Sequence, residues 1–223
     1  FPDFASVYSS ISETALNKTQ MGNLAKLGYF SKYGNENQIL ALIKLYDFIA
    51  ETKSSVSKKK LEENSIPLEM VIPFGRETKT RIMDLDKEAL LKVLESQVNE
   101  DEPTDYQKLY WQWKITGIAD KQFDSIPMNE LLVTNVQANK GSARVRLYSP
   151  VRGKSIEVKI QAKKFEAVPL EEGNFIRLEE IKRQIKKEFT GKILDNGKRE
   201  YLPVPSGETE PWASKYTILD KAQ

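Results

Sequence analysis

Cysteine and histidine are both missing from this chain of 223 residues. Without cysteine it can form neither disulfides nor thiolate metal sites. Without histidine it can supply no imidazole general base, no Ser–His pair and no Cys/His zinc site. Any metal would have to be bound by carboxylate and carbonyl oxygens, a ligand set that suits Mg²⁺ or Ca²⁺. These absences disfavour a self-contained enzyme.

Long apolar runs are absent as well. No stretch approaches the roughly 18–20 residues that a membrane-spanning helix needs. The first ten residues, FPDFASVYSS, have neither the basic nor the apolar region of a signal peptide. We therefore expect a cytoplasmic protein that has no membrane partner.

Charge is distributed unevenly, although the net charge is only +2. Residues 1–60 have a net charge of +3, residues 61–130 of −7 and residues 131–223 of +6. Two basic segments on either side of an acidic one indicate separate surfaces rather than a uniformly basic protein. Basic segments of this size are compatible with nucleic-acid binding.

Helical periodicity dominates residues 1–124. Gly28 is expected to end one helix in the left-handed conformation, and Asn35 or Asn37 to cap the next. Two prolines and a glycine predict an irregular connector near residues 65–82. The stretches DLDKEALLKVLESQV and DEPTDYQKLYWQWKITG predict two more helices, and DSIP, residues 124–127, interrupts the helical pattern.

From Met128 onward the period changes to that of strands. The stretches ELLVTNVQA, SARVRLYS and SIEVKIQA each alternate apolar and polar residues. Gly173-Asn174 favours a turn into a further strand, and the segment after Gly191 is rich in turn residues. We predict an α+β chain with a helical domain at residues 1–124 and a small closed sheet at residues 125–223.

The connection LGYFSKYGN, between two expected helices, has two interpretations. Hairpins of this kind hold DNA through backbone N–H groups in a glycine-containing turn and through nearby basic side chains. In the other interpretation the aromatic residues only anchor two antiparallel helices and the glycines are caps. Both can hold together, with Phe30 buried and the lysines outward. The candidate DNA-binding residues of the hairpin are Lys26, Gly28, Lys32, Tyr33, Gly34 and Asn35.

Basic residues also recur through the predicted strands. Residues 140–199 contain sixteen basic and eight acidic residues, an excess that favours a binding surface over a solvated sheet face. Arg144 and Arg146 alternate with apolar residues, so they share one face of a strand. Such a face suits single-stranded nucleic acid, whose bases stack on aromatic rings. The candidate residues are Arg144, Arg146, Tyr148, Lys154, Lys159, Lys163 and Phe165, with Tyr148 and Phe165 as the stacking rings.

Two carboxylates, Asp84 and Asp86, raise the alternative of a magnesium-dependent nuclease, with Glu88 as a third acid. A helix-forming stretch follows immediately, however, and acids at a helix N-terminus cap it and complement its dipole. We therefore interpret the pair as structural and expect no catalytic residue, metal site or cofactor in this chain.

The stretch LAKLGYFSKYGNENQIL, with the aromatic-rich segment before it, resembles the region after the fingers of bacterial replicative DNA polymerase III alpha subunits. In that family a pattern like LIKAGAFD ends one helix, and a turn leads into R/N-x-x-L/I-L. The stretch DYQKLYWQWKITGIADKQFDSIP then occupies the place of the family's helix ending in LG-x-Y-L-S-G-H-P-L, and strands follow. The resemblance, to a phage or prophage version, covers most of the chain in order.

The resemblance implies a helix-hairpin-helix-like domain followed by an OB-like β-barrel, in the C-terminal portion of a nucleotidyltransferase. The hairpin would grip duplex DNA and the barrel single-stranded template. The family's palm carboxylates and phosphoesterase histidines lie outside this chain, and the start at FPDF resembles a boundary inside a longer polymerase chain, which would be a partner. TGIAD replaces the family's SGHP turn. MVIPFGRE lies where the family has a sliding-clamp motif but lacks its glutamine, so binding of a clamp or other replisome proteins stays open.

A second function is compatible with the same residues. The chain could be a stand-alone adaptor protein that binds single-stranded nucleic acid through the barrel and a protein partner through the helical half. Carboxylates of a polymerase palm in a longer parent chain would decide for the polymerase.

Overall fold

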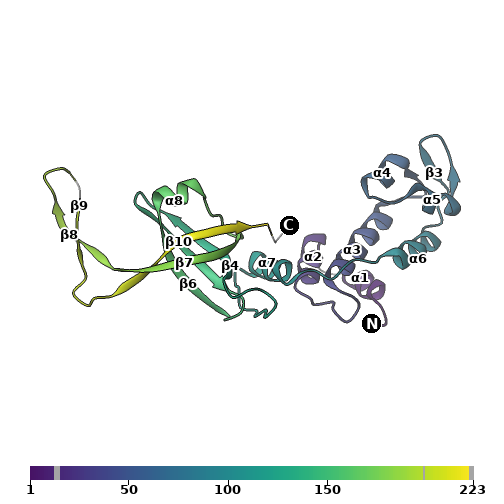
Figure 1. Ribbon diagram of the computed structural model, residues 1–223. Helices are drawn as coiled ribbons and strands as arrows, with labels where there is room; N and C mark the ends of the chain where they lie inside the picture. The colour runs from purple at the N-terminus through teal and green to yellow at the C-terminus, as the bar shows by residue number, and fades with distance from the viewer. Residues whose placement is uncertain (13–15, 198, 221–223) are drawn as a thin grey trace. The chain divides into compact units, whose positions relative to one another are not determined.

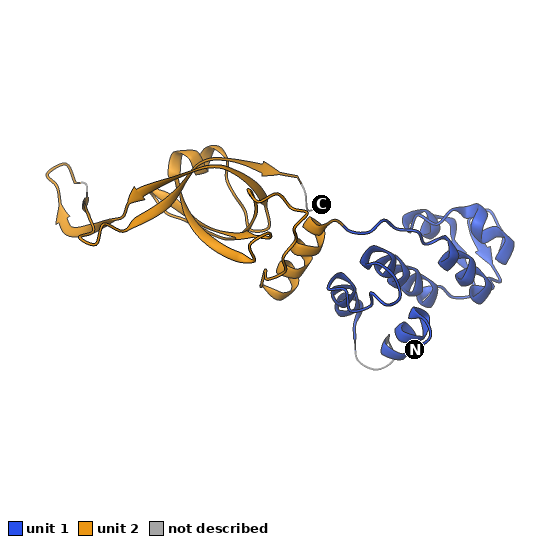
Figure 2. Ribbon diagram, turned by 60° about the horizontal axis from the view of Figure 1, so that its bottom comes forward, with its two compact units in different colours: residues 1–103 blue, residues 104–223 orange. Residues whose placement is uncertain are grey.

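The computed structural model describes residues 1–12, 16–197 and 199–220. The chain forms two compact units, residues 1–103 and residues 104–223, which are coloured separately in Figure 2. The α+β class agrees with the prediction. The boundary lies earlier than the expected one between residues 124 and 125, because the helix that precedes the strands belongs to the second unit.

The first three helices of unit 1 pack around one apolar cluster that includes Phe4, Met21 and Ile39. Asn17 and Asn35 begin the second and third helices as capping boxes, each accepting a hydrogen bond from the backbone N–H three residues later. For the third helix this confirms one of the two predicted caps. The helices are α1 (Phe4–Ser12), α2 (Lys18–Lys26) and α3 (Glu36–Glu51).

The remainder of unit 1 consists of short elements around a second cluster, which α3 and the last helix of the unit share. The connector expected near residues 65–82 is a series of such elements. Three strands form a small sheet in the order β1-β3-β2. The elements are β1 (Val56–Ser57), α4 (Lys58–Glu63), α5 (Leu68–Val71), the 3-10 helix η1 (Ile72–Phe74), β2 (Arg76–Glu77), β3 (Arg81–Met83) and α6 (Lys87–Gln97).

Unit 2 contains a closed five-stranded barrel with the order β10-β6-β5-β4-β7 (Figure 1). β6 and β10 pair in parallel, and the other barrel pairs are antiparallel. Apolar residues that alternate along the strands, among them Val133, Val145 and Val158, fill the interior. The elements are α7 (Asp105–Thr116), β4 (Glu130–Ala138), β5 (Ser142–Ser149), β6 (Lys154–Gln161), α8 (Ala162–Ala167), β7 (Phe175–Ile185), β8 (Lys187–Ile193), β9 (Arg199–Pro203) and β10 (Thr209–Leu219).

Helix α7 covers part of the outside of the barrel. Leu109 and Trp113 of α7 pack on Leu132 of β4 and on its neighbours across the sheet, Tyr148 of β5 and Phe175 of β7. A polar contact adds to this packing, since the Tyr106 hydroxyl of α7 donates a hydrogen bond to Glu130 at the start of β4, 2.5 Å away. At this end of the barrel the strands are therefore buried on both faces.

Strands β8 and β9 form a separate two-stranded sheet beyond the barrel. β7 and β10 pair from Phe175↔Leu219 to Ile185↔Thr209, and the chain between them continues into β8 and β9. Figure 1 shows β8 and β9 projecting from the barrel as an arm. We call the two strands, Lys187–Ile193 and Arg199–Pro203, the β8–β9 arm.

Candidate functional site

The open outer face of β5 presents two arginines. Arg144 and Arg146 are exposed, whereas Val145 and Leu147 between and beside them lie in the barrel core. The predicted alternation is thus confirmed for this part of the strand. Among the described residues no carboxylate forms an ion pair with either guanidinium, so both charges face solvent.

A row of outward side chains runs across the barrel at the level of Arg144. The strand registers place Gln137, Arg144 and Lys159 opposite one another on β4, β5 and β6, and Trp212 of β10 opposite Lys159. We call these four residues the outer row. It combines charge, a hydrogen-bonding amide and an aromatic ring on one face.

Lys159 and Trp212 are held together within the outer row. The Lys159 ammonium lies 5.6 Å from the centroid of the Trp212 ring and 2.5 Å from a carboxylate oxygen of Glu210. The indole N–H donates a hydrogen bond to the other oxygen of Glu210, 3.1 Å away. The ring is half-buried and is held in place by these contacts.

Tyr148 is not available as a stacking residue, contrary to the sequence prediction. It is only 1 % exposed, and its hydroxyl donates a hydrogen bond to the Lys121 carbonyl oxygen, 2.7 Å away. Burial raises the pKa of its phenol. The alternation that correctly exposes Arg144 and Arg146 also turns Tyr148 outward, but α7 covers the outer face at that position.

The prediction of Phe165 as a stacking ring is wrong as well. It lies on α8 and packs against the barrel core, so its ring serves packing rather than an open surface. Lys154 at the start of β6 and Lys163 on α8 are exposed, as expected. Most of the predicted basic side chains therefore lie on the surface, whereas neither predicted stacking ring is open to a base.

Trp212 was missed by the sequence reasoning. It stands in TEPWASKYTIL, where Pro211 and the preceding turn residues conceal a strand. Ala213 packs in the barrel interior, but the register of β10 against β7 shifts between Ala213 and Tyr216, so no simple alternation marks the outward position of Trp212.

The α2–α3 connection has the predicted glycine conformation. Gly28 has φ +80°, in the left-handed region that favours glycine. Several backbone N–H groups of this turn donate hydrogen bonds within the turn or to α2. The N–H of Gly28 bonds to the Ala25 carbonyl and that of Tyr29 to the Leu24 carbonyl; the N–H of Ser31 bonds to the Gly28 carbonyl and that of Tyr33 to the Phe30 carbonyl. These donors are occupied by the fold, so phosphate contact would have to depend more on side chains than expected.

The side chains of this hairpin divide into structural and exposed groups. Phe30 is buried, and the Tyr33 hydroxyl donates a hydrogen bond to the Phe1 carbonyl oxygen. Asn35 caps α3, and its amide donates to the Glu100 carbonyl oxygen, 2.9 Å away. Lys32 is exposed, with its ammonium 5.5 Å from the Tyr33 ring, and Lys26 is half-buried at the end of α2.

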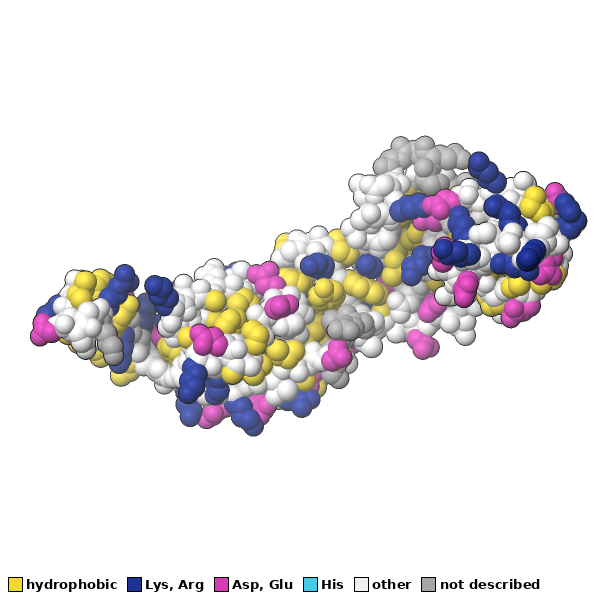
Figure 3. Space-filling view, turned by 90° about the horizontal axis from the view of Figure 1, so that it is seen from above, with side chains coloured by type: hydrophobic (Ala, Val, Ile, Leu, Met, Phe, Trp, Pro, Cys, Tyr) yellow, Lys and Arg dark blue, Asp and Glu magenta, His cyan; other side chains and the backbone are white. Residues whose placement is uncertain are grey.

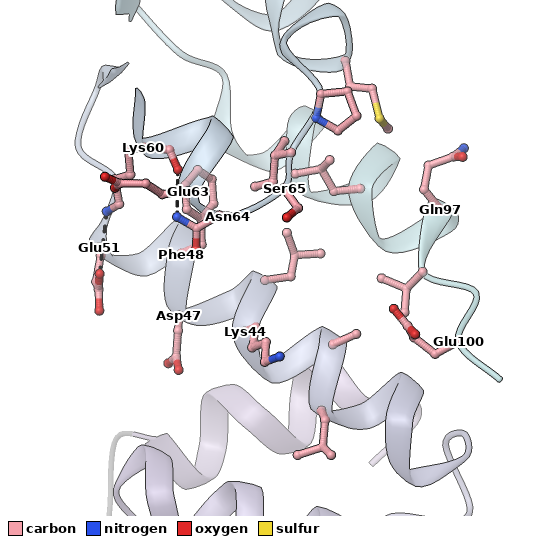
Figure 4. Close-up of a pocket in the computed structure, with 18 of the residues that line it drawn as sticks. Lys44, Asp47, Phe48, Glu51, Lys60, Glu63, Asn64, Ser65, Gln97 and Glu100 are labelled. Atoms are coloured by element: carbon pink, nitrogen blue, oxygen red, sulfur yellow. Dashed lines mark hydrogen bonds and ion pairs between the residues drawn. The ribbon is translucent and has the colours of Figure 1, made fainter. Parts of the chain in front are cut away.

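Unit 1 also contains an open groove of about 1060 Å³ along α3 (Figure 4). Its floor includes Phe48, and its rim carries charges of both signs that pair with one another. Lys18 lies 2.5 Å from a Glu51 oxygen, and Lys60 lies 3.6 Å from the other. The hydrogen bond from Lys18 lowers the pKa of Glu51. These ion pairs neutralise part of the charge around the groove.

Asp86 caps α6, as predicted: its carboxylate accepts a hydrogen bond from the Ala89 N–H, 3.1 Å away. Asp84 instead pairs with Arg76 at 3.2 Å. Within the described residues no cluster of three or more carboxylates could hold a metal ion. No helix in the same part of the chain has the length and hydropathy of a membrane span.

Comparison with known proteins returned no match to a family model, to a curated protein or to a solved structure.

Proposed function

We propose that this chain binds DNA as the C-terminal portion of a replicative DNA polymerase III alpha subunit, with its barrel holding single-stranded template. The observation that carries the proposal is the barrel with its open basic face. Around the barrel, starting from β4, its strands pair in the order β4-β5-β6-β10-β7, with β6 and β10 parallel and α8 following β6 in the chain. This arrangement is compatible with an OB-like barrel, and the second and third strands of an OB-fold bind oligonucleotides; here these strands would be β5 and β6.

The chemistry of that face supports single-stranded nucleic acid. Arg144 and Arg146 supply charge for the phosphate backbone, and Trp212 supplies a ring on which a base can stack. α7 covers the barrel around Tyr148 but not the outer row. The surface thus has both components that a non-specific single-strand site requires.

The assignment to a polymerase depends on the resemblance of LAKLGYFSKYGNENQIL. In that proposal the α2–α3 hairpin contacts duplex DNA. Because several of the turn's N–H groups bond internally, Lys26 and Lys32 would be the main contacts to phosphate. A palm with catalytic carboxylates elsewhere in the parent chain would carry out nucleotide transfer.

A stand-alone adaptor is the second candidate, and the groove along α3 favours it. Its apolar floor and paired rim charges resemble a site for a protein segment more than one for a polyanion. The adaptor would still bind single strands through the barrel, so the first experiment below tests what both functions share.

The barrel is tested by fluorescence anisotropy with labelled oligothymidylate over a series of salt concentrations. Arg144→Ala with Arg146→Ala should weaken binding and reduce the slope of log K against log salt by about 1.4, the value for two phosphate contacts on a single strand. Lys79→Ala with Lys92→Ala changes the net charge equally in unit 1 and is the matched control. Equal effects of the two double variants would contradict a barrel site.

The hairpin is tested with a duplex of the same length. Lys26→Ala with Lys32→Ala should weaken duplex binding more than single-strand binding, because a hairpin recognises the phosphate spacing of a duplex. Circular dichroism and melting of each variant check that it is folded. Equal losses on both substrates would contradict this division of roles and leave a generally basic protein.

A further inference from the structure

The β8–β9 arm exposes large apolar side chains that the barrel does not cover. Phe189, Tyr201 and Ile193 are 43 %, 49 % and 64 % exposed. Hydrophobic and basic side chains lie next to one another on the arm, at the left end of Figure 3. A two-stranded sheet has little core to hide such residues, and clusters of exposed apolar side chains mark interaction sites.

The two faces of the arm differ in chemistry. Phe189 lies opposite Tyr201 in the strand register, and Lys187 lies opposite Pro203. Because side chains alternate along a strand, Lys187, Arg199 and the two rings share one face. Glu188 and Glu200 lie on the other, where the Thr190 hydroxyl donates a hydrogen bond to Glu200, 2.9 Å away. We call Lys187, Phe189, Arg199 and Tyr201 the arm platform.

The arm platform is a compact group of rings and cations. The Phe189 and Tyr201 ring centroids are 5.8 Å apart, at an angle of 46°. The Arg199 guanidinium lies 5.4 Å from the Phe189 ring centroid. Neither Lys187 nor Arg199 forms an ion pair with a carboxylate of the described residues, so the positive charge of this face is not neutralised from within.

We propose that the arm platform is a second binding surface for single-stranded nucleic acid, separate from the outer row of the barrel. An unpaired base stacks on the Tyr201 ring, and the adjoining phosphates lie against Arg199 and Lys187. Rings supply the contact with bases and cations the contact with the backbone. The separation of both glutamates onto the opposite face gives the platform the charge complementarity that a polyanion requires.

The experiment uses the full chain and oligothymidylate of about 30 nucleotides, longer than the site of one barrel. Tyr201→Leu keeps an apolar side chain but removes the ring, and it should lower the affinity at least about fivefold. Tyr201→Phe keeps the ring and should bind like the parent chain. Leu202→Ala, on the opposite face of the same strand, is the matched control and should also leave the affinity unchanged.

Photocrosslinking of an oligonucleotide that contains 5-iododeoxyuridine locates the base directly. Crosslinks to Tyr201 or Phe189 are expected, and crosslinks there but not on the barrel would still support the arm while removing the proposed barrel site. Crosslinks on the barrel alone, or equal affinities of Tyr201→Leu and Tyr201→Phe, would overturn the inference and leave the barrel site intact. No binding at all would overturn both.

Discussion

Helix α7 should decide whether the barrel folds on its own. A fragment of residues 125–223 lacks α7, whereas residues 103–223 retain it together with its Thr104 cap. Loss of the helix removes Leu109 and Trp113 and uncovers Leu132, Tyr148 and Phe175, the last three no more than 1 % exposed. Burial of each such side chain contributes about 1.5–3 kcal/mol, so the set contributes roughly 7–15 kcal/mol as an upper estimate. A whole domain is stable by only about 5–15 kcal/mol.

The two fragments are compared by urea denaturation followed by circular dichroism. The longer fragment should unfold in one cooperative transition, and the shorter one should show none. In the longer fragment, Lys114→Ala, at an exposed position of α7, should leave the unfolding free energy unchanged. Trp113→Ala should lower the unfolding free energy by about 3–5 kcal/mol. A shorter fragment that unfolds cooperatively at the same midpoint would refute the reasoning, because the barrel would then need nothing from α7.

Three further changes test local features. Asp86→Ala should reduce the unfolding free energy of unit 1 in urea by about 1 kcal/mol, and Asp86→Asn, which keeps an acceptor for the cap, by much less. Gly28→Ala, at φ +80°, should destabilise by about 1–2 kcal/mol, whereas Gly22→Ala, inside α2 with room for a methyl group, should stabilise slightly. Burial, and then the hydrogen bond to Glu130, raise the pKa of Tyr106 from 10.0 to about 12, so its contribution to stability is present below pH 10 and lost as pH rises through 12. Unfolding of Tyr106→Phe measured across that range should therefore depend less on pH than unfolding of the parent chain.

The sequence could predict features that depend on neighbours along the chain. Asn35 and Asp86 are short polar residues directly before helix-forming stretches, and both are caps. The change of period at Met128 marks the start of the barrel strands, since each strand must bury every second side chain. The domain boundary depends on which surface α7 covers, and no local pattern contains that information.

The shared face of the β8–β9 arm could not be predicted from local sequence patterns either. Asn196-Gly197 correctly predicts a turn, whereas Gly191 lies within β8. β8 and β9 have few contacts with the rest of the barrel, so burial imposes no simple alternation on them. Their residues are exposed on both faces. Only the register, with Phe189 opposite Tyr201, shows that rings and cations share one side.

Charged and aromatic residues differ in how far their exposure can be inferred from sequence. Arg144 and Arg146 face solvent as predicted, because an unpaired guanidinium is costly to bury. A ring with one polar atom is stable in either place if that atom finds a partner. Tyr148 is buried with its hydroxyl on a backbone carbonyl, whereas Trp212 stays at the surface beside Lys159. Sequence alternation can therefore locate the phosphate-binding charges of such a barrel, but the rings that could receive its bases emerge only from tertiary packing.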